Sequence, residues 1–335
     1  MTEYHQENPF SVQIEPVEGC NLRCDFCGLN GIRGKENNYK MMSLETATKI
    51  AEGMKEYGWT SRIEFAMHGE PTFNDNLHEI IKVFRKNLPK ANLMMLSNGG
   101  NIIKDPLRMI TEYFSSGLDT LGLDEYQQIS LVPKIWKRLF EGNNQGVPIE
   151  EIGAGQVFFN DVSVWVYPDF GDGGNPHKRV KTKRLIRISP IDLQTKGTHS
   201  NLTNHTGAGA PKNNKKMGIR CAKPFREISF RYDGSVAICC NDWRGEFMIG
   251  SINDLSLKEL WNHERFKAAR KKLYYGERDF GACDGCDAMS YRLGFLPDKK
   301  GLDSLDRVNA EEELLIKEVE ALKTKADVFL REWEK

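Results

Sequence analysis

The eight cysteines of this 335-residue chain fall into two groups. Three lie near the N-terminus, and five follow after a gap of nearly two hundred residues: Cys20, Cys24 and Cys27, then Cys221, Cys239, Cys240, Cys283 and Cys286. The N-terminal segment is polar, and no stretch approaches the ~18 apolar residues of a membrane span. We therefore expect a cytoplasmic, reducing location, where such cysteines are more often metal ligands or catalytic thiols than disulfides. The fold must bring each group together at its own site.

Composition excludes several classes of protein. Apolar residues make up 39% of the chain and charged residues 28%, which is typical of a globular protein and not of a disordered or collagen-like one. The 47 basic and 47 acidic side chains balance. The chain as a whole therefore has no electrostatic attraction to nucleic acids or anionic membranes, although local basic patches remain possible.

Strand patterns alternate with helix patterns from residue 11 to about residue 191. We expect strands over 11–16, 62–67, 92–97, 119–125, 157–167 and 184–191, and helices after the cap Ser43 and over 75–87, 105–116 and 129–141. This alternation is typical of an α/β protein with a parallel sheet, either a partial barrel or an open sheet. In both of these folds, the functional loops follow the carboxyl ends of the strands. The N-terminal cysteines, His68–Pro71 and Ser97–Gly100 lie at such positions.

The pattern changes after residue 195. Segment 196–218 is rich in Gly, Asn, Lys and Thr and reads as a linker or an active-site lid. Strands over 226–232 and 235–240 flank Asp233–Gly234, which favours a type I′ hairpin, and a capping box at Ser256 and Glu259 begins a helix that runs toward Tyr275. A final helix over about 304–334 either packs on its own domain or forms a coiled-coil seam. We predict four parts: 1–195, 196–218, 219–298 and 299–335.

The spacing C-x3-C-x2-C places three thiolates on one short loop. Structural zinc normally takes four ligands, commonly as two separated pairs. Three close cysteines suit a 4Fe–4S cluster that leaves one iron without a protein ligand. The alternative is a zinc site that takes its fourth ligand from elsewhere in the chain.

The segment Cys20-Asn-Leu-Arg-Cys24-Asp-Phe-Cys27 resembles the signature of radical S-adenosylmethionine (SAM) enzymes, including the aromatic Phe26 before the last cysteine. The resemblance implies a partial (βα)6 barrel of the TIM type. It also implies that the three cysteines hold a 4Fe–4S cluster whose fourth iron chelates SAM. An electron from this cluster then cleaves SAM to a 5′-deoxyadenosyl radical, which abstracts a substrate hydrogen.

Two later motifs fit the same family. Met67-His68-Gly69-Glu70-Pro71 resembles its GGEP motif, with His68 in place of the first glycine. Ser97-Asn98-Gly99 resembles the segment that meets the SAM ribose or carboxylate. The resemblance implies that Phe26, Gly69, Glu70, Pro71, Ser97 and Asn98 contact SAM.

The second cysteine group has the order Cys, hairpin, Cys, helix, C-x2-C. Its spacing suits zinc and an iron–sulfur cluster equally well. The order resembles the C-terminal extension called SPASM, or twitch in its shortened form, which implies one auxiliary 4Fe–4S cluster held by Cys221, Cys239, Cys283 and Cys286. Neighbouring residues of a strand point to opposite faces, so only one of Cys239 and Cys240 should be a ligand, and we choose Cys239.

The two resemblances together imply a radical SAM oxidoreductase or isomerase that acts on a small polar substrate such as an amino sugar, a cyclitol or a nucleotide derivative. Asp124 and Glu125, at the end of the fourth strand, are candidates for the base, although capping or pairing with lysines would explain them too; we name Asp124. A flavodoxin or ferredoxin is the electron donor that the resemblance implies.

Two other classes of function remain open. Basic residues over 177–184 and at Lys212, Lys215 and Lys216 could meet phosphate groups, including those of a nucleic acid, or could be solvated surface charges. One alternative is therefore a radical SAM enzyme that modifies a nucleic-acid base or a peptide. The second is a non-catalytic protein that binds zinc or another metal.

Overall fold

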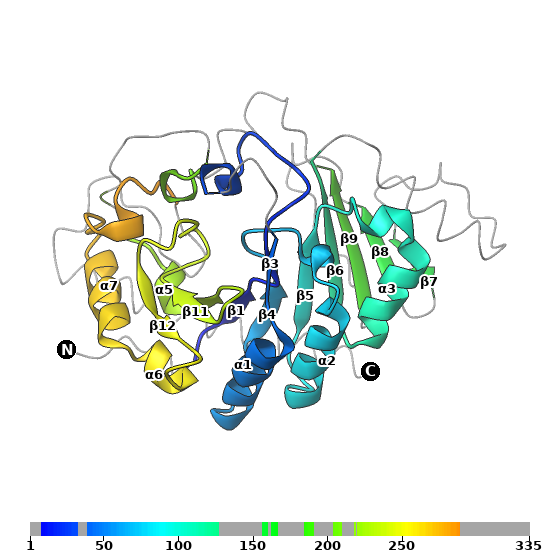
Figure 1. The fold of residues 1–335 in the computed structure, drawn as a ribbon, viewed down its shortest axis with the longest axis horizontal. Coiled ribbons are helices and arrows are strands. Elements are labelled where there is room, and N and C mark those ends of the chain that lie inside the picture. Colours follow the sequence, from blue (N-terminus) through cyan, green and yellow to red (C-terminus); the bar gives the residue numbers. More distant parts are fainter. Residues whose placement is uncertain are drawn as a thin grey trace, which may run out of the picture.

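The structure, a computed structural model, describes residues 8–32, 39–126, 156–159, 162–166, 184–190, 204–209, 218 and 220–288. Its strands are β1 (Ser11–Ile14), β2 (Val17–Glu18), β3 (Lys40–Met41), β4 (Arg62–Phe65), β5 (Leu93–Ser97), β6 (Thr120–Glu125), β7 (Gln156–Phe159), β8 (Val162–Val166), β9 (Arg184–Pro190), β10 (Glu227–Phe230), β11 (Ser235–Ala237) and β12 (Met248–Ser251). Ten of them form one sheet in the order β12-β11-β10-β1-β4-β5-β6-β9-β8-β7, and β2 pairs with β3 (Figure 1).

Seven neighbouring strands of this sheet run parallel, in the order β10-β1-β4-β5-β6-β9-β8. This confirms the predicted α/β fold with a parallel sheet. The order departs from a sequential barrel because β9 pairs with β6 and β8 lies outside β9. The single strand predicted over 157–167 was wrong: β7 and β8 are two antiparallel strands. The sequence between them is Asn160-Asp161, two residues that favour turns.

The side chains of β1 and β4 alternate between the two faces of the sheet. Val12, Ile14, Ile63 and Phe65 are fully buried in the apolar core. The core also contains the apolar sides of α1 (Leu44–Glu56), α2 (Leu77–Asn87) and α3 (Pro106–Ser115), which lie along one side of the sheet in Figure 1. The intervening residues of the two strands are polar and line a cavity. The sheet therefore has one apolar face and one polar face in this region.

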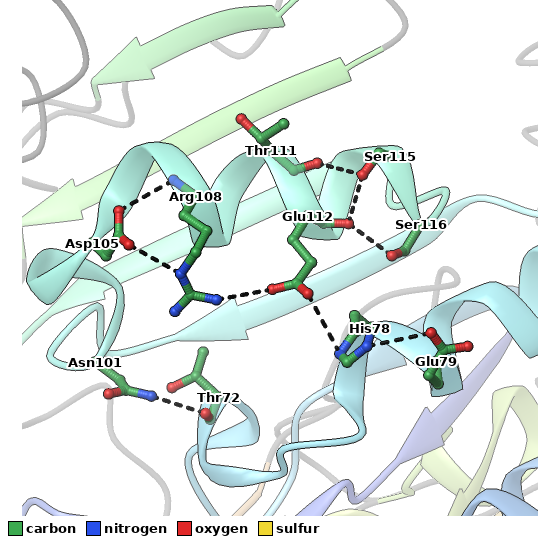
Figure 2. A network of polar contacts seen from close by, with 10 residues as sticks. All are labelled: Thr72, His78, Glu79, Asn101, Asp105, Arg108, Thr111, Glu112, Ser115 and Ser116. Carbon is green, nitrogen blue, oxygen red and sulfur yellow. Dashed lines mark hydrogen bonds and ion pairs between the residues drawn. The ribbon is translucent and has the colours of Figure 1, made fainter. Parts of the chain in front are cut away.

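Helix caps and loop contacts fix the ends of these elements (Figure 2). Ser43 caps α1 as predicted, because its hydroxyl accepts a hydrogen bond from the Thr46 N–H. Asp105 caps α3 in the same way, and its carboxylate also accepts from the Arg108 side chain at 3.0 Å. In the loop before α3, the Asn101 amide donates to the Thr72 carbonyl at 2.9 Å. This bond joins the loops that follow β5 and β4.

The C-terminal part continues the same sheet. β10 pairs in parallel with β1, and β11 pairs antiparallel with β10, so backbone hydrogen bonds join the extension to the barrel. The predicted hairpin exists, but its turn is not type I′, since only Gly234 of the two turn residues has a positive φ, +83°. The Gly234 N–H donates to the Arg231 carbonyl, which is typical of a three-residue loop with glycine in the left-handed conformation.

The helices of the extension are α5 (Lys223–Arg226), α6 (Leu257–Trp261) and α7 (Glu264–Tyr274); α6 and α7 lie beside β12 in Figure 1. The capping box of Ser256 and Glu259 is confirmed. The prediction of one continuous helix to Tyr275 was wrong. The first helix, α6, ends before Asn262, and His263 caps a second helix, α7, by accepting a hydrogen bond from the Arg265 N–H. The helix predicted over 129–141, the C-terminal helix and most of 196–218 lie outside the described residues.

A buried carboxylate, that of Glu15, links the end of β1 to the hairpin. The Glu15 side chain is fully buried and accepts a hydrogen bond from the Tyr232 N–H at 3.0 Å. Arg231 Nε lies 3.6 Å from the same oxygen, and the other oxygen lies 2.7 Å from Nδ1 of the equally buried His68. Burial alone would raise the pKa of Glu15, but His68 and Arg231 hold it below its usual value. The carboxylate is therefore ionised at neutral pH.

We expect Glu15→Gln to lower the free energy of unfolding by about 3 kcal/mol, because it removes the buried carboxylate that faces the His68 ring and Arg231 and leaves Arg231 with Glu18 as its anionic partner. Urea denaturation followed by circular dichroism measures this, with the exposed Glu45→Gln as a control that changes little. Since the pKa of Glu15 is lowered in the folded state, its contribution is complete above the unfolded value of about 4.3 and is lost as the pH falls through the folded value. Equal stability of Glu15→Gln and Glu45→Gln at pH 7 would contradict the expectation.

Candidate active site

The three N-terminal cysteines lie on the loop between β2 and the 3-10 helix Gly28–Gly31, and all three are partly exposed. A turn closes the loop through the Cys27 N–H and the Cys24 carbonyl, 2.9 Å apart. The cysteines line a cavity of about 610 Å³, which we call the main cavity. Burial, together with Glu70 and the neighbouring thiols, raises the pKa of Cys20 to about 11 despite a hydrogen bond from the Leu22 N–H. The thiolate form therefore needs a cationic partner.

Glu70 joins the predicted motifs into one network. Its carboxylate is 2% exposed and accepts hydrogen bonds from the hydroxyls of Thr72 and Ser97, at 2.6 and 2.7 Å, and from the Asn98 N–H at 2.7 Å. The Asn98 amide in turn donates to Cys20 Sγ at 3.4 Å. Burial raises the pKa of Glu70 above its usual value, and these hydrogen bonds only partly oppose the rise. The ends of β4 and β5 thus meet the cysteine loop in one hydrogen-bonded group.

Gly69 is required by close packing of two loops. It forms an isolated bridge with Gly19, and the Glu70 N–H donates to the Gly19 carbonyl at 2.9 Å. A Cβ atom on Gly69 would lie 2.1 Å from the Val17 carbonyl oxygen. No side chain fits there. Pro71 does not line the main cavity; it is buried and begins the 3-10 helix Pro71–Phe73.

His68, the residue that departs from the family motif, contacts the C-terminal extension. Its Nε2 lies 2.9 Å from the carbonyl oxygen of Cys240, and its ring centroid lies 4.5 Å from that of Trp243. This carbonyl and the Glu15 carboxylate lie next to the two ring nitrogens, one at each. Trp243 also packs over Gly28, where an added Cβ would come within 2.6 Å of the ring. His68 and Trp243 therefore hold together the cysteine loop, the loop after β4 and the loop between β11 and β12.

Asp124 lies where the sequence places it, at the end of β6, and it lines the main cavity. The hydroxyl of Tyr126 is 3.4 Å from Asp124 Oδ2, and the Tyr126 ring packs against Phe26 with centroids 5.4 Å apart. Burial and then the Asp124 charge raise the pKa of Tyr126 well above its usual value. Tyr126 and Phe26 both line the cavity, and the sequence analysis did not identify Tyr126.

Four C-terminal cysteines line a second, smaller pocket, which we call the cysteine pocket: Cys221, Cys239, Cys283 and Cys286. All four are buried. Cys240 differs from these four, because it lines the main cavity and not the cysteine pocket. Cys239 and Cys240 thus face different cavities, although β11 ends before them at Ala237. Burial raises the pKa of Cys283 and of Cys286.

Lys223 and Glu227 are cavity residues that the sequence analysis did not identify. Lys223 Nζ lies 3.0 Å from Glu227 Oε1 and 3.1 Å from Cys240 Sγ. Burial would lower the pKa of Lys223, but Cys240 and Glu227 hold it well above its usual value. Neither residue belongs to a motif. The spacing of four between a lysine and a glutamate was the only signal of their pairing.

The cysteines fit iron–sulfur clusters. None of the eight forms a disulfide, and the structure describes all eight. Backbone N–H groups point at two of the sulfurs, from Leu22 to Cys20 at 3.3 Å and from Ala288 to Cys286 at 3.4 Å, and such donors stabilise thiolates bound to iron. Within the described ranges, no three His, Cys, Asp or Glu side chains lie close enough to share one metal ion. A 4Fe–4S cluster instead takes each thiolate on a separate iron.

Comparison with known proteins gives matches in both parts of the chain. The family model of the radical SAM superfamily matches residues 14–124, and that of SPASM, an iron–sulfur cluster-binding domain, matches residues 221–287. The S-adenosyl-L-methionine-dependent 2-deoxy-scyllo-inosamine dehydrogenase of Niallia circulans is 20% identical over 280 residues, which cover 83% of this chain and 93% of that protein. The S-adenosylmethionine-dependent nucleotide dehydratase of Flammeovirga pacifica is 33% identical over 97 residues, 28% of this chain and 32% of the relative.

A solved structure shares the fold. The crystal structure of BtrN in complex with AdoMet and 2-DOIA superposes with a TM-score of 0.57 at 16% identity, and covers 84% of this chain and 93% of that one. None of the helices in the described part of the chain has the length and apolar character needed to cross a bilayer. Together with its cysteine loop and its strand-end network, the two matches show that the chain contains a radical SAM domain over residues 14–124 and a SPASM iron–sulfur cluster-binding domain over residues 221–287.

Proposed function

We propose that this chain oxidises or rearranges a small polar substrate, such as an amino sugar, a cyclitol or a nucleotide derivative, by radical SAM chemistry. The observation that carries the proposal is the hydrogen-bonded group of Glu70, Ser97 and Asn98, which contacts Cys20 inside the main cavity. Three motifs that lie far apart in the sequence meet at one place with the chemistry that the family uses there.

Cys20, Cys24 and Cys27 would hold the 4Fe–4S cluster that binds SAM. The cavity next to them is also lined by Gly69, Glu70, Ser97 and Asn98, and by Phe26, which packs against Tyr126. The buried Glu70 carboxylate suits the amino group of SAM, and the strand-end N–H groups and amides suit its ribose and carboxylate. Pro71 serves this site only by fixing the backbone after Glu70.

Cys221, Cys239, Cys283 and Cys286 would hold the auxiliary 4Fe–4S cluster. When they are bound, SAM and the two clusters supply hydrogen abstraction and one-electron transfer. Asp124 lies within the main cavity and is a candidate to accept a substrate proton there, with Tyr126 holding its carboxylate in place. A flavodoxin or ferredoxin would supply the electron to the first cluster.

The polar face of β1 and β4 supports a small, hydroxyl-rich substrate. Gln13 donates to Glu64 at 2.9 Å, Arg62 is paired with the same carboxylate, and all three line the main cavity. Donor and acceptor side chains therefore lie next to one another on the face of the sheet that borders the cavity. The two relatives named above act on an aminocyclitol and a nucleotide. Modification of a macromolecule remains the alternative that the test below separates.

Anaerobic reconstitution with iron and sulfide should load ~8 iron atoms per chain, as two 4Fe–4S clusters require, and the protein should then cleave SAM to 5′-deoxyadenosine. Cys20→Ala combined with Cys24→Ala and Cys27→Ala should lose about half of this iron and all cleavage. Iron analysis and chromatography of the nucleoside measure both. One or two zinc ions without SAM cleavage would instead establish the non-catalytic metal-binding alternative.

Cys239→Ala and Cys240→Ala should differ sharply. The first should lose ~4 iron atoms, the content of one 4Fe–4S cluster, and the second should keep both clusters, since Cys240 lies outside the cysteine pocket. Iron content and Mössbauer spectra of the two variants give the answer. The opposite result would make Cys240 the ligand.

Formation of 5′-deoxyadenosine should increase when the correct class of substrate fills the main cavity. We expect aminocyclitols, amino sugars or nucleotides to stimulate it above the substrate-free rate, and deuterium to move from the substrate into 5′-deoxyadenosine. Stimulation only by RNA, DNA or peptides, with salt-dependent binding in the case of nucleic acids, would support the macromolecular alternative.

A further inference from the structure

A charged pair lies between the main cavity and the cysteine pocket. Lys223 is the first residue of α5, and Glu227 is the first residue of β10, so one short helix and the sheet hold both side chains in place. Their charged atoms are 3.0 Å apart, and the side chains are 24% and 11% exposed. At this degree of burial a charge acts over several ångströms with little screening by water.

The two members of the pair are not placed equally. Lys223 lines both cavities, whereas Glu227 lines the main cavity alone. The ammonium group is 3.1 Å from Cys240 Sγ, and the preceding residue, Cys239, lines the cysteine pocket. The positive member of the pair therefore borders both the cysteine pocket and the main cavity, and the negative member borders the main cavity alone.

The other cation at the cysteine pocket has a different role. Arg278 is buried and donates to the carbonyls of Cys286 and Ala288, at 3.1 and 2.9 Å, and to that of Arg220. It fixes the loop that carries Cys286 and lies away from the main cavity. Lys223 is the cation that separates the two cavities in the described part of the chain.

We propose that Lys223 is a positioning residue that raises the reduction potential of the auxiliary 4Fe–4S cluster, and that Glu227 opposes it. Reduction adds a negative charge to the cluster, and a nearby ammonium group stabilises the reduced form. A cluster of higher potential accepts an electron more readily from the side of the main cavity. The inference rests on the proposed function, because it assumes that the cysteine pocket holds a cluster.

The test measures the potential of the auxiliary cluster alone. Redox titration followed by electron paramagnetic resonance is done in the protein that carries Cys20→Ala, Cys24→Ala and Cys27→Ala, which removes the signal of the first cluster. Lys223→Met should shift the midpoint potential downward and Glu227→Gln should shift it upward, while Lys223→Arg should stay near the parent value. Lys271→Met, an exposed change on α7, is the control and should cause no shift.

Shifts of opposite sign support the inference, since a merely structural pair would not produce them. If both Lys223→Met and Glu227→Gln keep their iron and neither shifts the midpoint potential, the inference is overturned. If Lys223→Met loses its iron, an unshifted Glu227→Gln also overturns it, because the pair would then serve only to build the loop. Absence of auxiliary iron from the parent protein is a separate outcome, and it counts against the two-cluster function itself.

Discussion

The parallel pairing of β10 with β1 is the interaction on which the arrangement of the site depends. β1 is hydrogen-bonded on both edges over the same four residues, by β4 on one side and by β10 on the other. Without the β10 edge, the hairpin and its cysteines would be a separate appendage. With it, both parts of the chain belong to one sheet and both line the main cavity.

The replacement of glycine by histidine at position 68 follows from this arrangement. A buried imidazole at the end of β4 needs partners for both nitrogens, and it finds Glu15 on one side and the Cys240 carbonyl on the other. Glycine could provide neither contact. The departure from the family motif thus adds a link between the loop after β4 and the loop after β11.

Much of the fold and of the metal centres could be predicted from the sequence, because local rules determine them. The alternation of Ser11 and Gln13 with Val12 and Ile14 marks a strand with one polar face, and Ser43 marks a helix start. The errors lie where one residue changes a local outcome: His263 begins a new helix, and Asp233 does not adopt the positive φ of a type I′ turn.

Tertiary contacts account for what the sequence analysis missed. Tyr126, Lys223 and Glu227 reach the main cavity only because distant elements meet there, and no spacing in the chain announces this. Cys240 was recognised as different from Cys239 through strand alternation. In the structure the two cysteines line different cavities, as expected. They lie beyond the end of β11, however, so the course of the following loop separates them and not the alternation of a strand.

The continuous sheet has a consequence for electron tunnelling. Tunnelling rates fall steeply with distance, so a donor and an acceptor on two hinged bodies would exchange electrons in bursts as the bodies approach and separate. Here backbone pairing over four residues joins β1, in the part of the chain with the first cysteine group, to β10, in the part with the second. Electron transfer between the two sites would then take place across one continuous sheet and not across a hinge.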